Sequence, residues 1–111
     1  IEETTRFYQD LIGLPVAQVQ SGGLCRIFDT GYGYFGFCQY SDGRPLPNGP
    51  KGVCLSFNCR DEEDVDAHYR EFTQRGLTAT TPQRHKVFPV YSFFLTDPNG
   101  YNVEFQKILE Q

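Results

Sequence analysis

The chain has 111 residues, which is enough for one modest hydrophobic core and too few for two independent domains. Its net charge is −4 and its lysines and arginines form no cluster, so it lacks the concentrated positive charge of a nucleic-acid-binding surface. It contains no run of about 18 apolar residues, the length that a membrane-spanning helix needs. Ten Phe and seven Tyr give a composition that favours strands.

The first part of the chain predicts a helix followed by three strands. Charged residues begin a helix over residues 2–12, and Gly13 is suited to a left-handed cap at its end. Turn-forming glycines then separate three extended segments, which are residues 14–20, 24–29 and 34–40. Residues 41–50 contain three Pro and two Gly, and this stretch predicts a linker or an exposed loop.

The second part predicts a strand, a helix and three further strands. Residues 53–59 alternate, and their two faces consist of Val53, Leu55 and Phe57 on one side and of Cys54, Ser56 and Asn58 on the other. Asp61 is expected to cap a helix that extends through Arg75 and is closed by Gly76. The remaining strands are expected near residues 77–81, 90–96 and 101–108, with a loop at 82–89 and a turn at 97–100.

An internal repeat organises the chain. The segments FYQDLIGLPV and HYREFTQRGLTA share a helix with aromatic residues, a Gly-Leu pair and an extended stretch. The sequence therefore predicts an α+β fold of two β-α-β-β-β modules within a single domain, residues 1–111. Module 1 covers about residues 1–40 and module 2 about residues 51–111. Because the strand that opens module 2 has its counterpart upstream of the first residue, the first strand of module 1 is expected to be absent from this sequence.

Two motifs resemble those of a known family. TTRFYQDLIGLPV is similar to the first-helix motif of the vicinal-oxygen-chelate superfamily, which includes glyoxalases, bleomycin resistance proteins and extradiol dioxygenases. YSFFLTDPNGYNVEFQKI resembles the closing signature of that family, in which a DP-x-G turn leads into a strand with an acidic residue. The resemblance implies that the curved mixed sheets of the two modules form a cup, with the helices outside. The cup would hold a metal ion, a chelating substrate or both.

Glu104 is the leading candidate for a functional residue. It lies four positions after Gly100 of the turn, where the resemblance implies a metal ligand. A carboxylate on a rigid strand can bind a divalent ion and later accept a substrate proton. We therefore expect Glu104 to be a metal ligand and catalytic group, and the alternative is an exposed or ion-paired strand carboxylate.

The other metal-ligand positions are less clear. Cys54 stands where the resemblance implies a histidine; its thiolate would bind zinc or iron, or else the ligand has been lost and Cys54 is only small and half-buried. In module 1 the residue that corresponds to Glu104 is Phe35, Phe37 or Gln39, all of which are expected to face the cup. Of these, Gln39 can serve as a neutral oxygen ligand. The ion would be iron, zinc, manganese or nickel.

Aromatic residues are expected to shape the substrate cup. Phe35, Phe37 and Phe94 would form an apolar wall for a flat or hydrophobic ligand, although such residues also build ordinary cores. His85 lies in a loop that either covers the cup and receives an anionic substrate or is simply solvated. His68 is expected on the outer helix, in a structural or solvent-exposed role.

The four cysteines are expected to be reduced thiols of a cytoplasmic protein. Three of them lie within apolar strand patterns, where a free cysteine behaves as a small hydrophobic residue; the four are Cys25, Cys38, Cys54 and Cys59. A core-competent chain also has less need of a disulfide framework than a very small domain.

Three functions are compatible with these features. The first is a divalent-metal-dependent lyase, isomerase or dioxygenase that acts on a small molecule. The second is a metal-free binding or resistance protein of the antibiotic-binding type, with an aromatic cup. The third is a fold retained for dimerisation. The resemblance also implies a homodimer, and neither nucleic acid nor a membrane is an expected partner.

Overall fold

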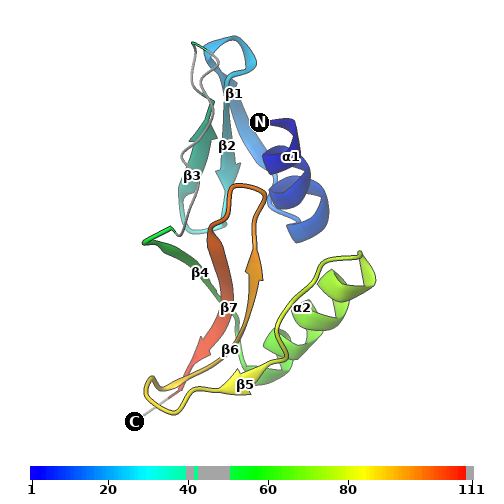
Figure 1. The fold of residues 1–111 in the computed structure, drawn as a ribbon, viewed down its shortest axis with the longest axis vertical. Helices are drawn as coiled ribbons and strands as arrows, with labels where there is room; N and C mark the ends of the chain where they lie inside the picture. The colour runs from blue at the N-terminus through cyan, green and yellow to red at the C-terminus, as the bar shows by residue number, and fades with distance from the viewer. Residues whose placement is uncertain (40–41, 43–50, 110–111) are drawn as a thin grey trace. The chain divides into compact units, whose positions relative to one another are not determined.

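A computed structural model describes residues 1–39, 42 and 51–109 of the chain (Figure 1). The chain separates into two compact units, residues 1–48 and 49–111, and each unit has its own helix and its own sheet. Most of the predicted linker lies outside the described residues. None of the helices in the described ranges is long and apolar enough to cross a membrane.

The first unit contains one helical segment and an antiparallel sheet in the order β1-β2-β3. The helix begins as α1 (Glu2–Thr5) and continues as the π-helical η1 (Arg6–Ile12). It ends at Gly13, whose φ of 98° lies in the left-handed region that glycine adopts without strain. The remaining elements are β1 (Val16–Gln20), the short 3-10 turn η2 (Ser21–Gly23), β2 (Cys25–Asp29) and β3 (Tyr34–Cys38).

Tyr8 is the centre of the core of the first unit. Its side chain is fully buried, and its ring centroid lies 5.5, 5.3 and 5.1 Å from those of Phe28, Phe35 and Phe37, respectively. Since these three residues come from β2 and β3, burial of aromatic surface holds the helix against the sheet. We call the face of a sheet that its own helix covers the helix face, and the opposite face the open face.

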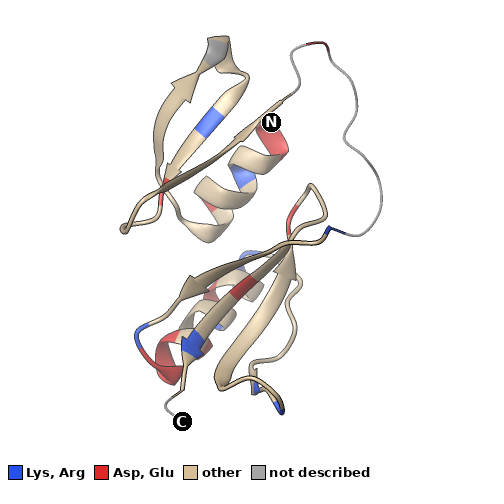
Figure 2. Cartoon of the chain, turned by 90° about the vertical axis from the view of Figure 1, so that its left-hand side faces the viewer, with Lys and Arg blue, Asp and Glu red and all other residues tan. Residues whose placement is uncertain are grey.

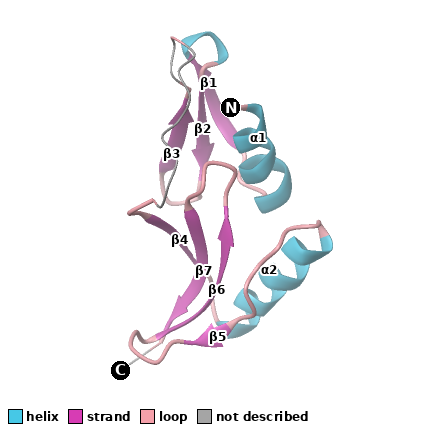
Figure 3. Cartoon of the chain, in the orientation of Figure 1, coloured by secondary structure: helices cyan, strands magenta, loops and turns pink. Residues whose placement is uncertain are grey.

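The second unit contains the helix α2 (Glu62–Gln74) and a mixed sheet in the order β4-β7-β6-β5. Strand β4 is parallel to β7, and the other neighbours are antiparallel. The helix lies along one side of this sheet (Figure 3). Asp61 begins it as predicted, because its carboxylate accepts a hydrogen bond from the Asp64 N–H at 2.7 Å. The strands are β4 (Cys54–Asn58), β5 (Gln83–Arg84), β6 (Val90–Thr96) and β7 (Asn102–Ile108).

The core of the second unit lies between α2 and the middle of its sheet. Phe72 of α2 has its ring centroid 4.9 Å from that of Phe105 and 6.0 Å from that of Phe93, and the two strand residues stack on each other at 5.6 Å. Val65 of α2 is also fully buried. Burial of each such side chain contributes roughly 1.5–3 kcal/mol, so this layer fixes which side of the sheet the helix covers.

These elements confirm the predicted fold class. The second unit follows the order β-α-β-β-β, and the first has the helix and three strands of the same plan. The predicted repeat therefore corresponds to two units of one architecture.

One predicted strand differs from the structure. Residues 77–81 do not form a strand, and β5 lies in the segment that was expected to be a loop. Thr80 donates one backbone hydrogen bond to the Phe94 carbonyl, but its side-chain hydroxyl accepts the Phe94 N–H in place of its own carbonyl. Pro82 then interrupts the pairing because it has no N–H to donate.

The expectation of four reduced cysteines is wrong for one pair. Cys25 and Cys38 form a disulfide, whereas Cys54 and Cys59 are free. The bridged residues lie directly opposite each other across β2 and β3, with their Cα atoms 4.1 Å apart. Alternation within each strand did not reveal this pair, because it does not say which residues stand opposite in the neighbouring strand.

Candidate functional site

The open face of the second sheet carries the main candidate site. Pairing across β4, β7 and β6 places Ser56, Glu104 and Phe94 in one row. Their sequence neighbours point the other way, since Phe57 stacks on Phe105 and the latter packs against α2. Because strand side chains alternate, the row faces away from α2. The predicted alternation of β4 and β7 is thus what brings these three side chains to one surface.

Glu104 lies near the middle of this surface and is only 9% exposed. The Ser56 hydroxyl donates a hydrogen bond to its Oε1 atom at 2.7 Å. A carboxylate has about four lone-pair positions, so this contact orients the group and leaves further positions for another donor or a cation. The structure therefore places a fixed acceptor where the sequence predicted a functional carboxylate.

Cys54 belongs to the same surface, with its Sγ atom 3.8 Å from the Ser56 hydroxyl oxygen. Partial burial raises the pKa of the Cys54 thiol, and the negative charge of Glu104 raises it further, while the contact with Ser56 acts in the opposite direction. The thiol therefore stays protonated at neutral pH. The neutral thiol extends the polar row, and a metal ion would have to displace its proton before the sulfur could bind.

His85 and Phe94 add an aromatic border to the surface. The two ring centroids are 5.7 Å apart in an edge-to-face arrangement. The His85 Nε2 atom lies 3.1 Å from the hydroxyl oxygen of the buried Ser92, and the His85 N–H bonds to the Val90 carbonyl. These contacts bring the predicted loop residue onto the open face beside Phe94.

A hollow of about 300 Å³ lies next to this row. Phe94 and Asn102 contribute to it from the central strands, and both share the open face with Glu104. Its full lining consists of Thr78, Ala79, Thr80, Phe94, Leu95, Thr96 and Asn102. The volume is at the lower end of the range of about 300–1,000 Å³ that is typical of small-molecule sites.

Three predicted site residues of the first unit lie elsewhere. The rings of Phe35 and Phe37 pack on Tyr8, on the helix face rather than on the open face where they were expected. Gln39 lies beyond the end of β3, where its Oε1 atom accepts a hydrogen bond from the terminal amine of Ile1 at 3.3 Å. The burial of these two aromatic rings decides which face of β3 packs against the helix. The predicted correspondence with Glu104 therefore gave the wrong face for both residues.

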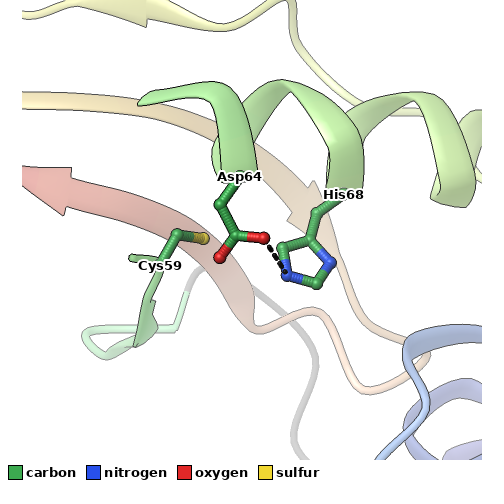
Figure 4. A group of neighbouring side chains, drawn as sticks. All are labelled: Cys59, Asp64 and His68. Carbon is green, nitrogen blue, oxygen red and sulfur yellow. Dashed lines mark ion pairs between the residues drawn. The ribbon is translucent and has the colours of Figure 1, made fainter. Parts of the chain in front are cut away.

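A second group of polar side chains lies at the start of α2. Cys59, Asp64 and His68 each offer one donor atom, and these atoms all lie within 4.8 Å of one another (Figure 4). His68 lies on the outer helix as predicted, but the sequence pattern did not indicate this group. The spacing of Asp64 and His68 on one helix face was a usable signal, whereas the approach of Cys59 depends on how β4 leads into the helix.

Comparison with known proteins identifies the fold and the family. The profile of the glyoxalase/bleomycin resistance protein/dioxygenase superfamily matches residues 1–105. No curated protein matches the sequence. Among solved structures, a glyoxalase/bleomycin resistance protein/dioxygenase family enzyme from Burkholderia phytofirmans PsJN is 24% identical, with a TM-score of 0.74 over 98% of this chain and 91% of that chain.

Two other solved structures share the fold at lower identity. Lactoylglutathione lyase from Agrobacterium tumefaciens is 19% identical, with a TM-score of 0.72 over 96% of this chain and 84% of that chain. An integron cassette protein from the mobile metagenome of the Halifax Harbour sewage outfall is 16% identical, with a TM-score of 0.78 over 96% and 87%, respectively. At these identities the likeness concerns the fold alone.

Proposed function

We propose that this chain, which belongs to the glyoxalase/bleomycin resistance protein/dioxygenase superfamily, binds a small molecule on the open face of its second sheet. The observation that carries the proposal is the Glu104 carboxylate, which is nearly buried, oriented by Ser56 and directed to a face that α2 does not cover. Burying a carboxylate costs free energy unless it is hydrogen-bonded. A ligand that donates to Glu104 would offset more of this cost than Ser56 does alone.

The surface around Glu104 suggests the chemistry of the ligand. Phe94 and His85 offer ring surface on one side of the row, which suits a flat or apolar group. Glu104 suits a hydrogen-bond donor or a positive charge, and the Asn102 amide at the hollow can both donate and accept. A small aromatic compound with a cationic or hydroxylic substituent fits this set, in the manner of an antibiotic-binding protein.

A ligand screen on the full chain tests this proposal. Small aromatic compounds with and without a cationic substituent are added to ¹⁵N-labelled protein, and amide chemical-shift changes are mapped. We expect the shifts to centre on Glu104 and Phe94, and Glu104→Gln to weaken binding of the cationic compounds by about tenfold or more. Glu71→Gln, a carboxylate of α2 that pairs with Arg75, is the matched control. Shifts confined to the helix faces would refute the proposal.

A metal-dependent lyase, isomerase or dioxygenase reaction is the second candidate, because Glu104 stands at the position where the family uses a metal ligand. The donors of this unit fit such a centre incompletely. Among the described residues of the second unit, the donors recorded beside Glu104 are the Ser56 hydroxyl and the Cys54 thiol. Within the described residues, Glu104 belongs to no group of three His, Cys, Asp or Glu donors. We therefore derive no catalytic step through a metal ion.

Metal analysis separates the two candidates. The protein is reconstituted with iron, zinc, manganese or nickel and its metal content is measured beside that of Glu104→Ala. Metal that disappears in Glu104→Ala would make Glu104 a ligand and favour the enzymatic function. Metal content that is unchanged in Glu104→Ala would leave small-molecule binding as the function of this face.

The same proposal includes a cytoplasmic homodimer. Family membership supports pairing of two chains, and the acidic net charge of −4 is compatible with a protein that is not attached to anionic membranes or nucleic acids. The Cys25–Cys38 disulfide would then be the oxidised form of the chain. Sedimentation equilibrium tests the dimer, and thiol trapping in fractionated cells tests both the compartment and the state of this pair.

A further inference from the structure

The group at the start of α2 combines three kinds of metal donor. Cys59 supplies sulfur, His68 supplies an imidazole nitrogen and Asp64 supplies a carboxylate oxygen, and the donor atoms lie within 4.8 Å of one another. The Asp64 Oδ1 and His68 Nε2 atoms are 3.5 Å apart, and the Asp64 carboxylate lies between the Cys59 sulfur and the His68 ring (Figure 4). Metal–ligand distances of about 2.0–2.3 Å in a tetrahedral zinc site place ligand atoms roughly 3.3–3.6 Å apart.

The scaffold holds the three residues independently of any ligand. Cys59 follows β4, and its N–H donates to the Gln106 carbonyl at 2.7 Å. Asp64 and His68 are four residues apart on α2 and therefore share one face of the helix. The His68 ring stacks on Phe72 at 5.5 Å, which limits its rotation. Burial and the negative charges of Asp64 and Asp61 raise the pKa of the Cys59 thiol to about 11, so a bound ion would have to displace its proton.

The surroundings also suit a cation. The first turn of α2 contains Glu62, Glu63 and Asp64, and Figure 2 shows acidic residues gathered at this helix start in the unit that contains the C-terminus. Among the described residues, Arg60 is the arginine that pairs with Asp64. Its guanidinium contacts the Asp64 carboxylate at 3.3 Å, and its side chain is 85% exposed. Such an exposed side chain can turn to solvent when an ion binds.

The unmet hydrogen-bonding potential of His68 is a further observation. Its Nδ1 atom is buried without a hydrogen-bond partner among the described residues, and the other ring nitrogen, Nε2, is the one that faces Asp64. The Asp64 contact engages one nitrogen of the His68 ring, whereas a metal ion would engage Cys59, Asp64 and His68 together.

We propose that Cys59, Asp64 and His68 bind a zinc ion that fastens the start of α2 to the end of β4. The fourth position would be occupied by water, because the His68 side chain is 35% exposed and the group reaches solvent there. This site lies on the helix face of the sheet, and Glu104 lies on the open face. The proposal is therefore independent of the function proposed for Glu104.

Cobalt(II) is a direct probe of this site, because a thiolate ligand gives it an intense near-ultraviolet charge-transfer band. The full chain is titrated with Co²⁺ and then with Zn²⁺, with the Cys25–Cys38 disulfide intact. We expect one equivalent of Co²⁺ to bind with this band and to be displaced by Zn²⁺. Cys59→Ser should abolish the band, while Cys54→Ser, which changes the other free cysteine, should retain it.

Two further variants make the result decisive. His68→Gln should weaken Zn²⁺ binding by about a hundredfold or more, since even residues behind metal ligands contribute 10- to 100-fold. It also answers the question if Cys59→Ser fails to fold, because His68 is partly exposed. Glu104→Gln should leave the band unchanged. The proposal is overturned if the wild-type chain shows no thiolate band, or if the band survives Cys59→Ser or His68→Gln binds Zn²⁺ normally.

Discussion

The two units have the same architecture but different open faces. On the open face of the first unit, the Ile27 side chain lies over Gly36. The Cys25–Cys38 disulfide joins the next pair of opposite residues on that face. In the second unit the corresponding face carries Glu104 with its partner Ser56. Both helix faces, by contrast, are aromatic cores. The helix face therefore keeps the same character in both units, whereas the open face is bridged by a disulfide in the first unit and carries a buried carboxylate in the second.

The C-terminal turns of the two helices differ by one residue. The Tyr8 carbonyl accepts the Leu14 N–H, and the Phe72 carbonyl accepts the Leu77 N–H, so Tyr8 and Phe72 occupy matching places. The stretch from Tyr8 to Leu14 is one residue longer, and the π-helical turn of η1 accommodates the additional residue. A local insertion thus changes the helix type without moving the buried ring from the centre of its core.

The largest expected effect tests whether Tyr8 and Phe72 are equivalent. Both side chains are at most 1% exposed. Tyr8→Ala and Phe72→Ala should each lower the unfolding free energy of their own unit by about 3–5 kcal/mol, because each leaves a cavity under an aromatic cluster. Urea denaturation followed by two-dimensional NMR reports the units separately. Tyr32→Ala, at a residue that is 98% exposed, is the control, and a loss below about 1 kcal/mol in either core variant would break the equivalence.

The disulfide should account for the next largest difference between the units. Reduction of Cys25–Cys38, or Cys38→Ser, should destabilise the first unit by about 3 kcal/mol, as expected for a loop of this length. The second unit should not respond. Denaturation with and without dithiothreitol measures this, and thiol titration of the oxidised protein should count the two free cysteines. Equal destabilisation of both units would contradict the assignment of the bridge to one of them.

Gly36 tests the close packing of the first open face at a smaller scale. A Cβ atom on Gly36 would lie 2.5 Å from Ile27 Cδ1 and 2.9 Å from the Arg26 carbonyl oxygen, and the backbone cannot move away as easily as a side chain. Gly36→Ala should therefore cost about 1–3 kcal/mol of unfolding free energy. Gly33→Ala is the matched control, since a Cβ there meets nothing within 4 Å. Similar thermal midpoints for the two variants would show that the face is loosely packed.

The smallest effect concerns the second open face. Because the charge of Glu104 contributes to the raised pKa of Cys54, Glu104→Gln should lower that pKa and increase the thiolate fraction at neutral pH. Alkylation of Cys54 by iodoacetamide at pH 7.5 should then be about twofold faster, with its pH–rate profile shifted to lower pH. Mass spectrometry follows the reaction, and Glu63→Gln serves as the control. A slower reaction would show that Glu104 does not act on this thiol.

Local patterns were sufficient for much of the second unit. The alternation of residues 53–59 and the DP-x-G turn before β7 indicated which side chains share the face of Glu104, and the structure agrees. In the first unit the correspondence with Glu104 predicted the wrong face for Phe35 and Phe37, whose apolar rings pack on Tyr8 on the helix face. Hydrophobic burial was the better guide there.

The sequence by itself determined most of the element types, the two-unit plan and the face of each residue in β4 and β7, because these follow from periodicity and turn chemistry over a few residues. Only the tertiary structure decided which distant side chains meet. Ser56 and Glu104 are 48 residues apart and become neighbours because β4 pairs with β7. Cys25 meets Cys38 through strand register, and Cys59 meets His68 through the path from β4 into α2. Strand order and register depend on the packing of the whole unit, which no local pattern encodes.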